Sequence, residues 1–460
     1  MAIPRRDPLR GMAEFVALDI GSSFIKAALL DLDRMELRHC ARAPFPEFLA
    51  GLLADRREVD PAAVMKVVYE LLERVVPLAS TLQGVVLCGQ MHGFVLVNSR
   101  GEAVSNYISW LDRRVQTREF DMMASLISKA ESAEAGHELR PSIAVSMLYW
   151  LNRKGCLPPG ECTPVSIADF VAGQLCGNRP VMEPTQAAAF GAFHLGTMNW
   201  HREMIGKLGL EGLRWPEVVP SCTVAGTWRG LPCYATLGDQ QAALLGALLG
   251  AGELSVNIGT GSQVAVLSST IAEESNEAQT RPYFDGSFLR TITHIPGGRA
   301  LTALIGLLTE LGSLSEVEAW PKIDAAVKAT PHTNLRAGLA FFPGPCGVGG
   351  FLENLNESSL NIGHVFRAAF ESMATNYVAC AARLQSRDPI KQLVFSGGVA
   401  RRAALVRELT AEALRLPHRL SPDAEDTLLG LMVLALVVSG RHPSFAPATG
   451  ALRSSLELPS

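Results

Sequence analysis

The sequence predicts an α/β protein with two lobes, because the same order of elements occurs once in each half. In each half, two strands joined by a glycine-bearing turn are followed by a helix and then by a short apolar strand that ends at glycines. The length of 460 residues supports this division, since single hydrophobic cores stop growing beyond about 300 residues. Each lobe is therefore expected to contain a mixed sheet flanked by helices.

The first copy begins with two apolar runs, residues 15–20 and 24–32, which are predicted to be strands. The turn between them lies in the string LDIGSSFIK, which carries one aspartate, one glycine and two serines. A helix is expected over 60–79, where apolar side chains recur at helical spacing behind the candidate N-cap Asp60. A buried strand over 84–89 then ends in a glycine-bearing loop.

The second copy has the same order. Strands are predicted over 253–258 and 263–269, joined by the turn GTGS. A helix is expected over about 362–385, and a further strand over 392–398 again ends at glycines. The repeat therefore predicts a duplicated architecture rather than two unrelated domains.

The boundary between the copies is expected near 246–252, which divides the chain into residues 1–248 and 249–460. The longest late apolar run, residues 428–440, is too short for a membrane span, which needs about 20 residues. This run is therefore expected to be a buried helix.

Composition excludes several classes of function. The formal net charge is −4 and the sequence pI is near 6.2, so neither nucleic acid nor an anionic membrane is expected as a partner. Nine cysteines are scattered without a CxxC pair, which predicts reduced thiols in a cytoplasmic protein. Cys156 and Cys162 lie close in sequence, but such a pair alone is weak evidence for a metal.

The two turns DIGSS and NIGTGS stand at equivalent places in the repeat. Either turn alone is explained equally well by an ordinary hairpin. Backbone N–H groups in such turns also form nests that bind anions, and hydroxyl groups add donors. An aspartate beside them suits the magnesium ion that accompanies a nucleoside triphosphate. Their paired occurrence favours a polyphosphate held between the two lobes.

Six strings occur in an order that resembles the FGGY carbohydrate kinases: LDIGSSFIKAALLD, GQMHGFVLV, ISWLDRR, LGDQQAALLGA, NIGTGSQV and LVFSGGVARR. The resemblance covers residues 14–440. It implies an actin-like ATPase (ribonuclease H-like) fold with a central cleft in which ATP, Mg²⁺ and a small-molecule sugar meet. It also implies a monomer or a homodimer without nucleic-acid or membrane partners.

Within the family, the string GQMHG at 89–93 looks like that of xylulokinases and sedoheptulokinases rather than that of glycerol kinases. The strings SMLYWL and LCGNRPVMEPTQAAAFGAF are more similar to sedoheptulokinases. The resemblance therefore implies transfer of the γ-phosphate of ATP to a hydroxyl of a ketose, with sedoheptulose first. Xylulose or another pentulose or polyol is the alternative substrate.

Asp239, in the string GDQQ, matches the position of the family's catalytic base. A positioned carboxylate can accept the proton of a sugar hydroxyl as the phosphoryl group arrives. The same residue is implied to contact the sugar and the metal. From the residues alone the favoured role is a helix N-cap, because QQAALLGALL is typical of a helix start.

The two hairpins are expected to bind the nucleotide. Asp19 is expected to orient Mg²⁺, through water, together with Asp239; an Asx turn is the alternative for Asp19. The second hairpin is expected to hold the β- and γ-phosphates. The glycines after strand 392–398 are expected to face adenine and ribose, unless they form an ordinary strand-to-helix turn. The expected nucleotide-binding residues are Gly21, Ser22, Ser23, Lys26, Gly259, Thr260, Gly261, Ser262, Gly397 and Gly398.

A sugar site needs several neutral donors and acceptors. The expected sugar-binding residues, besides Asp239, are Gln90, Met91, His92, Trp110, Asp112 and Arg114. In this set Trp110 is expected to pack on a face of the sugar. Asp112 and Arg114 contact hydroxyls or pair with each other, and an exposed salt bridge is an equal alternative. His294, in the string THIPGG, is a weaker candidate from the second lobe.

Two segments depart from the family pattern. The first hairpin has Ser-Ser-Phe where relatives have Thr followed by Thr or Ser and a small residue, although Ser22 keeps a hydroxyl. Residues 343–354 lack the Gly-Glu-Arg string of relatives, which puts the cleft-closing contacts of this segment in doubt.

Two other classes of function share the expected fold. A nucleotide-dependent conformational machine would need neither GQMHG nor GDQQ. An inactive sugar sensor would not need Asp19, Asp239 and the GTGS turn together. The sequence therefore favours a sugar kinase over both.

Overall fold

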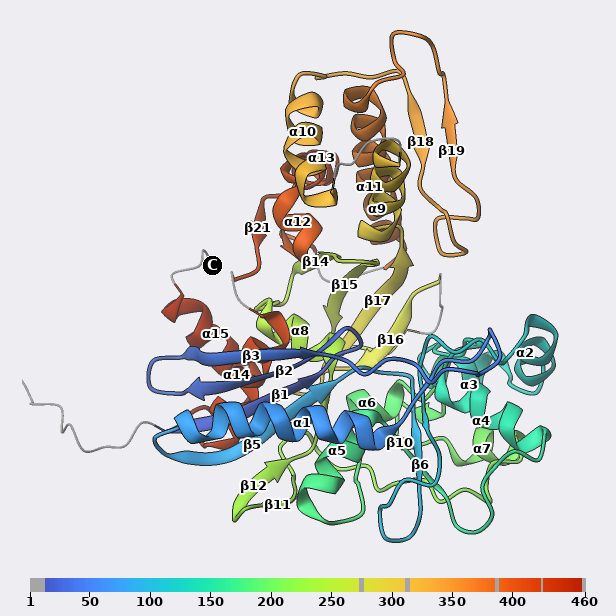
Figure 1. Ribbon diagram of the computed structural model, residues 1–460, viewed down its shortest axis with the longest axis vertical. Helices are drawn as coiled ribbons and strands as arrows, with labels where there is room; N and C mark the ends of the chain where they lie inside the picture. The colour runs from blue at the N-terminus through green and yellow to red at the C-terminus, as the bar shows by residue number, and fades with distance from the viewer. Residues whose placement is uncertain (1–12, 273–276, 311–314, 385–388, 423–424, 457–460) are drawn as a thin grey trace, which may run out of the picture.

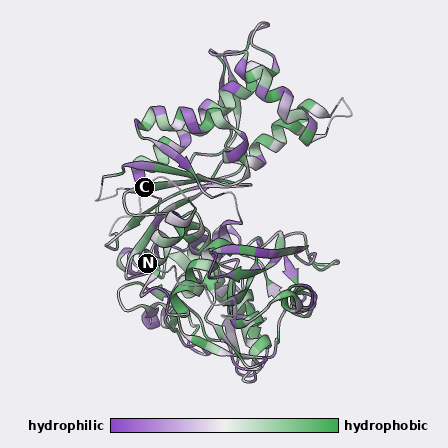
Figure 2. Ribbon diagram, turned by 90° about the vertical axis from the view of Figure 1, so that its left-hand side faces the viewer, coloured by the Kyte–Doolittle hydropathy of each residue, from purple (hydrophilic) through white to green (hydrophobic). Residues whose placement is uncertain are grey.

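The computed structural model describes residues 13–272, 277–310, 315–384, 389–422 and 425–456. Two mixed sheets form the centre of the molecule, one above the other in the view of Figure 1, and helices lie beyond each. Figure 2 shows the same two parts from the side, with the larger part below. The fold is a two-domain α/β fold, as predicted.

The first sheet has the strand order β11-β12-β5-β1-β2-β3, and β13 also pairs with β5. β1 is antiparallel to β2 and parallel to β5. The three strands predicted in the first copy are confirmed to within two residues. The strands are β1 (Glu14–Ile20), β2 (Phe24–Asp31), β3 (Glu36–Pro44), β5 (Leu82–Gly89), β11 (Val224–Trp228), β12 (Leu231–Tyr234) and β13 (Leu237–Gly238).

The second sheet has the order β16-β17-β15-β14-β20-β21. β14 is antiparallel to β15 and parallel to β20, which repeats the pairing of β1 with β2 and β5. The predicted duplication is therefore present in the topology. The strands are β14 (Glu253–Ile258), β15 (Ser262–Ser268), β16 (Gln279–Pro282), β17 (Phe288–Ile295), β20 (Gln392–Ser396) and β21 (His418–Leu420).

Short two-stranded ladders join the loops around these sheets. They are β4 (Glu58–Val59) with β7 (Tyr107–Ile108), β6 (Val95–Val97) with β8 (Thr163–Val165), β9 (Phe193–His194) with β10 (Asn199–Trp200), and β18 (Arg336–Gly338) with β19 (Phe351–Glu353).

The helices α1 and α5 pack on one face of the first sheet, and α9 to α13 pack with the second. The helices are α1 (Pro61–Val75), α2 (Thr117–Ala124), α3 (Lys129–Glu134), α4 (Ala144–Arg153), α5 (Ile167–Cys176), α6 (Pro184–Ala188), α7 (Arg202–Lys207), α8 (Asp239–Gly246), α9 (Gly298–Thr309), α10 (Glu316–Lys328), α11 (Ile362–Arg383), α12 (Gly398–Arg402), α13 (Ala404–Leu414), α14 (Asp426–Val438) and α15 (Phe445–Ser455).

The first predicted helix is shorter than expected. Its N-cap is Asp60, whose carboxylate accepts from the N–H of Ala62 at 2.9 Å, as the sequence predicted. The α-helix ends at Val75, and residues 76–78 form a single 3₁₀ turn. Pro77 explains the difference, because it lacks the N–H that would continue the helical hydrogen bonding.

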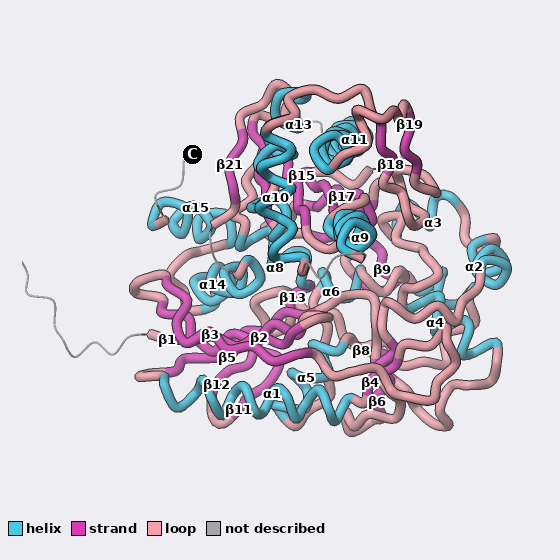
Figure 3. Tube along the Cα trace, turned by 45° about the horizontal axis from the view of Figure 1, so that its top comes forward, coloured by secondary structure: helices cyan, strands magenta, loops and turns pink. Residues whose placement is uncertain are grey.

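The helices α8 and α14 lie between the two sheets (Figure 3). They cross at two glycines: a Cβ at Gly246 would lie 1.7 Å from the carbonyl oxygen of Asp426, and one at Gly430 would lie 1.9 Å from that of Ala242. Only glycine allows this close approach. The expected buried helix is thus confirmed as α14.

The predicted boundary within 246–252 coincides with the connection from α8 to β14. α14 and α15 nevertheless pack with residues of the first sheet, such as Phe15 and Val86. The exact division of the chain into domains stays a prediction.

All nine cysteines are free thiols. In the part of the chain that the structure describes, no helix is both long and apolar enough to cross a membrane. The cytoplasmic location stays a prediction.

Candidate active site

Asp19 lies near the end of β1, directly opposite Lys26 of β2 in the antiparallel register. The Lys26 ammonium is 3.2 Å from the Asp19 carboxylate and 2.9 Å from that of Glu425. Thr427, in the first turn of α14, donates to Asp19 at 2.6 Å. Burial alone would lower the pKa of Lys26, but the two carboxylates raise it above its usual value. Asp19 thus contacts a second strand and a distant helix, so the Asx-turn alternative does not describe it.

The second hairpin is held by neutral groups. The Asn257 amide donates to the hydroxyl of Ser396 at 2.8 Å. The backbone N–H groups of Gly298 and Arg299, at the start of α9, donate to the carbonyls of Gly259 and Thr260 at 2.8 Å each. A Cβ at Gly298 would lie 2.7 Å from that Gly259 oxygen, so the hairpin and the helix pack backbone to backbone.

Ser262 ends this hairpin, and its side chain is buried. Its hydroxyl lies 2.9 Å from the hydroxyl of Tyr377 on α11. The exposed residues of the turn are Thr260 and Gly261. The backbone of the turn is therefore more open to a ligand than the hydroxyl of Ser262.

Asp239 is the first residue of α8, and the N-cap is Gly238. The N-cap role that the residues alone favoured for Asp239 is therefore wrong, because the helix begins one residue earlier than that role requires. Burial raises the pKa of the Asp239 carboxyl to about 7, and the negative charge of Asp19 acts in the same direction. The hydrogen bond from the Gln240 backbone and the charge of Arg281 oppose this rise. The two aspartates of the predicted metal site are thus electrostatically coupled.

Gln90, Met91 and His92 follow β5. The backbone N–H of Gln90 donates to the carbonyl of Ile20 at 3.0 Å, which continues the pairing of β5 with β1. Its side chain is buried, and its Nε2 has no hydrogen-bond partner among the described residues. A buried amide without a partner is costly unless a ligand or water completes it.

His92 has a φ of +72°, a left-handed backbone conformation that is uncommon outside glycine. Its Nδ1 lies 2.9 Å from the carbonyl oxygen of Ala189. A carbonyl only accepts, so Nδ1 carries the proton and the neutral ring presents Nε2 as an acceptor. Burial, and then the charge of Arg281, lower the pKa of His92 to about 4, which keeps the ring neutral near pH 7.

Asp112 and Arg114 form a buried ion pair. The guanidinium of Arg114 donates to Asp112 at 2.7 and 2.9 Å and to Glu58 at 2.6 Å. The Arg57 backbone N–H also donates to Asp112 at 2.8 Å. The exposed salt bridge considered from the sequence is therefore wrong in its exposure, since both side chains are buried and brace the loop that carries Trp110.

Arg281 was missed from the sequence. This buried side chain of β16 donates to both carboxylate oxygens of Glu138, at 2.5 and 3.0 Å, and also to the side-chain oxygen of Gln240. Gln240 follows the catalytic candidate directly and could have been suspected from the string GDQQ. Arg281 and Glu138 lie 143 residues apart in the chain, and no local sequence pattern predicts their pairing.

The short helix α6 fixes the two strand ends that carry Gln90 and Asp239. The Gln186 amide donates to the carbonyls of Gly89 and Leu237, at 3.0 Å each. The hydroxyl of the preceding residue, Thr185, accepts from the N–H of Gly238 at 2.8 Å. These bonds set the separation of the two loops, and sequence reasoning gave no role to either residue.

One cavity of about 360 Å³ brings these parts together. The lining includes predicted residues of both hairpins and of the sugar-binding loops: Ser22, Gln90, Met91, His92, Trp110, Asp239, Gly261 and Ser262. Gln240, Arg281 and His294 line it as well. The structure thus gathers at one place residues that the sequence predicted 240 positions apart, from Ser22 to Ser262.

Some predicted residues lie outside this lining. Of the described residues that line the cavity, none is Asp19, Lys26, Asp112 or Arg114. Gly21 and Ser23 flank Ser22 in the first hairpin. Gly397 and Gly398 also lie outside it, at the N-terminus of α12. Gly397 has a φ of +92°, and a Cβ there would lie 2.5 Å from the Ile258 carbonyl, so these glycines adjoin the second hairpin.

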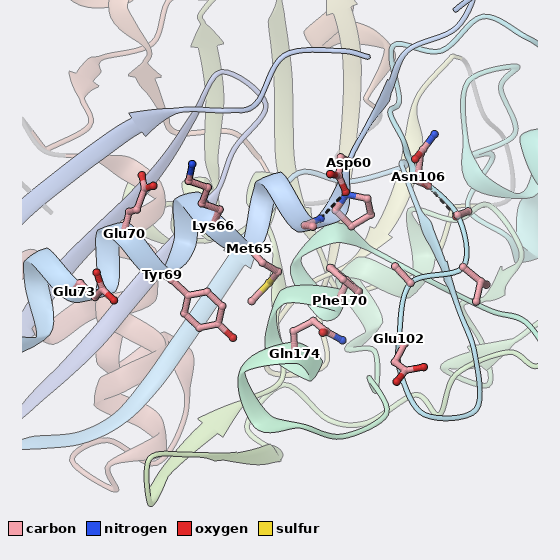
Figure 4. A pocket seen from close by; sticks show the side chains of 15 residues that line it. Asp60, Met65, Lys66, Tyr69, Glu70, Glu73, Glu102, Asn106, Phe170 and Gln174 are labelled. Carbon is pink, nitrogen blue, oxygen red and sulfur yellow. Dashed lines mark hydrogen bonds between the residues drawn. The ribbon is translucent and has the colours of Figure 1, made fainter. Parts of the chain in front are cut away.

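A larger hollow, of about 1080 Å³, lies on the outer side of the first part of the molecule between α1, α5 and residues 102–106 (Figure 4). Glu70, Glu73 and Glu102 give it an acidic border. None of its described lining residues was predicted for the site. The smaller cavity between the sheets therefore remains the candidate active site.

Solved structures show which class of protein has this fold. Xylulose kinase from Lactobacillus acidophilus superposes with a TM-score of 0.83, covering 97% of this chain and 96% of that chain at 15% sequence identity. The fold is therefore that of the two-domain sugar kinases, with the actin-like ATPase architecture that was predicted.

Residues 15–246 match the N-terminal domain of the FGGY family of carbohydrate kinases, and residues 255–439 match its C-terminal domain. The protein belongs to the FGGY family of carbohydrate kinases, phosphotransferases that use ATP and have an alcohol group as acceptor.

Relatives that are named for different substrates have similar sequence identity to this chain. Sedoheptulokinase from Homo sapiens is 24% identical, covering 93% of this chain and 97% of that protein. Glycerol kinase from Thermus brockianus is 28% identical, covering 72% of this chain and 70% of that protein. The family is therefore shown, whereas the sugar is a matter for proposal.

Proposed function

We propose that this protein transfers the γ-phosphate of ATP to a hydroxyl of a ketose, with sedoheptulose as the first candidate. The observation that carries the proposal is the single cavity lined by Asp239, by the sugar-binding loop and by both glycine hairpins. Sedoheptulose is supported by the string GQMHG and by the similarity to human sedoheptulokinase. Xylulose is the second candidate, because the same string also resembles that of xylulokinases.

Asp239 is the proposed general base. A base acts best when its pKa lies near the working pH, and burial brings the pKa of this carboxyl to about 7. As the sugar oxygen attacks the γ-phosphorus, Asp239 accepts the hydroxyl proton and the bond to the β-phosphate oxygen breaks. The position of Asp239 at the start of α8 aims it at the cavity from a rigid element.

Gln90 and His92 are proposed to orient the sugar. The unpartnered Nε2 of Gln90 donates to a sugar oxygen, and the neutral Nε2 of His92 accepts from a sugar hydroxyl. Arg281, paired with Glu138, holds Gln240 beside the base. One donor and one acceptor on the same loop, two residues apart, suit a polyol, whose hydroxyls both donate and accept.

Magnesium fits the coupled carboxylates of Asp19 and Asp239, since Mg²⁺ prefers carboxylate oxygens and keeps several water ligands. These two residues would hold the ion, Asp19 through water. When bound, Mg²⁺ supplies positive charge that offsets the charge of the phosphates. The hairpin around Gly259 and Thr260 offers backbone groups to the same phosphates.

Substitution of Asp239 by Asn tests the proposed base. Because Asn cannot accept the proton, kcat is expected to fall by about 10²–10⁴-fold while ATP binding is retained. Turnover is measured by coupled ADP release and ATP binding by calorimetry. Asp121→Asn, on the exposed surface of α2, is the matched control and is expected to leave both unchanged. Turnover of D239N at the unsubstituted rate would remove Asp239 as the base.

A panel of sugars tests the substrate. ADP release is compared for sedoheptulose, xylulose, ribulose, fructose, glycerol and erythritol, and the largest kcat/KM is expected for sedoheptulose. A preference for xylulose would select the second candidate. Absence of sugar-dependent ADP release from the whole panel would favour a conformational machine or an inactive sensor instead.

A further inference from the structure

Two pairs of cysteines in the described part of the chain are joined by sulfur hydrogen bonds. Cys176, at the end of α5, contacts Cys233 of β12. Cys346, between β18 and β19, contacts Cys380 of α11. The proposed kinase function uses neither pair of cysteines.

The second pair is held by an arginine. Arg383 lies one helical turn beyond Cys380 and donates to its sulfur at 3.2 Å. The same guanidinium donates twice to the carbonyl of Pro345, at 3.1 Å each, which fixes the residue before Cys346. Arg383 also forms an ion pair with Glu277. Figure 1 shows the strands that flank this loop beside α11.

The environment makes the two sulfurs unequal. The hydrogen bond from Cys346 lowers the pKa of the Cys380 thiol, and the charge of Arg383 lowers it further against the effect of burial. The pKa of Cys346 is raised, because its thiol donates to Cys380 and is itself partly buried. The guanidinium of Arg383, 3.2 Å from the Cys380 sulfur, favours the thiolate form at Cys380 over that at Cys346, and thiolates rather than thiols react with oxidants.

The pair adjoins both sides of the candidate active site. Tyr377, which contacts the Ser262 hydroxyl of the second hairpin, lies one turn before Cys380 on α11. On the other side, a Cβ at Gly344 would lie 2.7 Å from the carbonyl oxygen of His294, which lines the cavity. A covalent bond at this pair would therefore fasten the loop beside His294 to the helix behind the nucleotide hairpin.

We propose that Cys346 and Cys380 form a redox-modification site, at which hydrogen peroxide converts the two thiols into a reversible intramolecular disulfide. The Cys380 thiolate attacks one peroxide oxygen, the O–O bond breaks, and hydroxide leaves. The Cys346 sulfur then attacks the resulting sulfenic acid of Cys380, forming the S–S bond, and its proton leaves with the hydroxyl as water. Two sulfurs lose two electrons in total, and the peroxide gains them.

A small oxidant suits this arrangement. Cys380 is 0% exposed, whereas Cys346 is partly exposed. Hydrogen peroxide is little larger than water, whereas oxidised glutathione is bulky. Peroxide is therefore expected to oxidise the pair much faster than oxidised glutathione does, although the exposed thiols Cys40, Cys156 and Cys222 are open to both reagents.

Mass spectrometry of the full chain after peroxide treatment tests the site. The expected product joins the peptides that contain Cys346 and Cys380, with the loss of two hydrogens, and dithiothreitol restores the thiols. In Cys346→Ser the reaction stops at the sulfenic acid of Cys380, so dimedone is expected to label Cys380 when it is added together with denaturant, which exposes the buried sulfur. In Cys380→Ser neither the linked peptide nor dimedone labelling of Cys346 is expected.

The role of the arginine is tested by rate. Arg383→Gln is expected to slow formation of the linked peptide by about three- to tenfold and to move its pH profile to higher pH, because the thiolate loses a positive neighbour. Arg383→Lys keeps the charge and is expected to recover much of the rate. Circular dichroism and the melting temperature establish that each variant is folded.

The other pair is the matched control. Cys176 and Cys233 have no guanidinium partner among the interactions described for them. They are expected to remain unlinked while Cys346 and Cys380 react, and Cys176→Ser is expected to leave that reaction unchanged. Equal linking of both pairs, or oxidation confined to the exposed cysteines, would overturn the proposal. Each readout is a peptide mass, so the result does not depend on the sugar kinase activity.

Discussion

The two hairpins share a backbone pattern but carry different side chains. Asp19 pairs across its hairpin with Lys26, and at the equivalent positions Asn257 pairs with Gln263. The parallel neighbour of Asp19 is Cys88, whereas that of Asn257 is Ser396. The first hairpin therefore holds a carboxylate and an ammonium, and the second holds two amides and a hydroxyl.

The difference shows how two hairpins with the same backbone pattern can be suited to different ligands. Fixed charges in a desolvated place are costly unless they are paired, and Asp19 is paired with Lys26 and receives a bond from Thr427. Amides and hydroxyls need hydrogen bonds but no counter-charge. The first hairpin is thus suited to a cation and the second to backbone contacts with phosphate, and exchanging their side chains tests this division.

Among the substitutions that exchange the two hairpins, the largest effect is expected from Asp19→Asn, which gives the first hairpin the amide of the second. Mg²⁺ prefers carboxylate ligands, and Asn offers only an amide oxygen. We therefore expect kcat to fall by about 10²-fold. The Mg²⁺ concentration for half-maximal rate is expected to rise. Both are measured by ADP release.

Glu425→Gln is the control for that experiment. It removes the other carboxylate of Lys26 from a partly exposed position and keeps Asp19. A much smaller loss is expected from it. Equal losses from the two variants would show that Asp19 matters only through Lys26.

The reciprocal substitution, Asn257→Asp, places a negative charge in the second hairpin. A carboxylate about 8 Å from a phosphate at an effective dielectric constant near 20 costs about 2 kcal/mol, so the KM for ATP is expected to rise at least tenfold. Titration of ATP at two salt concentrations measures this, since screening reduces the effect. Asn257→Ser, which keeps a neutral polar group, is the control; a rise of the same size in N257S would mean that lost hydrogen bonding, not charge, is the cause.

A third experiment concerns buried carboxyls elsewhere in the two parts. Burial raises the pKa of Asp169 to about 7, and the partners described for its carboxyl are the hydroxyls of Ser166 and Thr236 and the backbone N–H of Ser166. Glu253, beside β20, instead has a lowered pKa: burial would raise it, but Arg419 prevails. In the folded state Asp169 therefore favours the protonated form, and Glu253 favours the charged form.

The raised pKa of Asp169 determines how pH changes the stability of the fold. The neutral Asp169 carboxyl stabilises the fold below the unfolded pKa of 3.8, and this contribution is lost as pH rises through about 7. It amounts to a few kcal/mol, since one pKa unit is about 1.4 kcal/mol. Asp169→Asn is therefore expected to flatten the decline in urea midpoint between pH 4.5 and 7.5, relative to the Asp121→Asn control. An unchanged slope would mean that Asp169 is not the titrating group.

The smallest effect is expected from Ser262→Ala. It leaves the buried Tyr377 hydroxyl with one long contact, at 3.5 Å to the carbonyl of Pro296. The expected cost is about 1–2 kcal/mol of stability with little change in kcat, measured by urea unfolding and ADP release. Ser22→Ala, at the exposed place in the first hairpin, is expected to cost nothing measurable in stability. A large loss of kcat in S262A would mean that its hydroxyl serves the nucleotide after all.

Local pattern was sufficient to predict the six strands of the repeat, its two hairpins and the helices α1, α11 and α14. Period-2 and period-3.6 spacing is a property of neighbouring residues, which one sequence displays. The catalytic candidate and the sugar loop were found through short strings beside those elements. The error at the end of α1 came from extending the helical spacing past Pro77.

Long-range contacts were not predictable in this way. Arg281 finds Glu138 through the packing of β16 against a loop, and Gln186 reaches two strand ends from a five-residue helix. The residues between β7 and β11 form their own core around Trp200, with Trp215 at 4.7 Å between ring centroids. None of these pairs has a fixed spacing in the chain.

The glycine crossing of α8 and α14 bears on the order in which the protein is made. The helix that begins with Asp239 is covered by a helix whose contact residue, Gly430, lies 184 positions after Gly246 in the chain. During synthesis, the emerging first half therefore exposes one apolar side of α8 until α14 has been made. Chains that stop before α14 would keep that side of α8 exposed, so the candidate active site takes its final form only after α14 has been made.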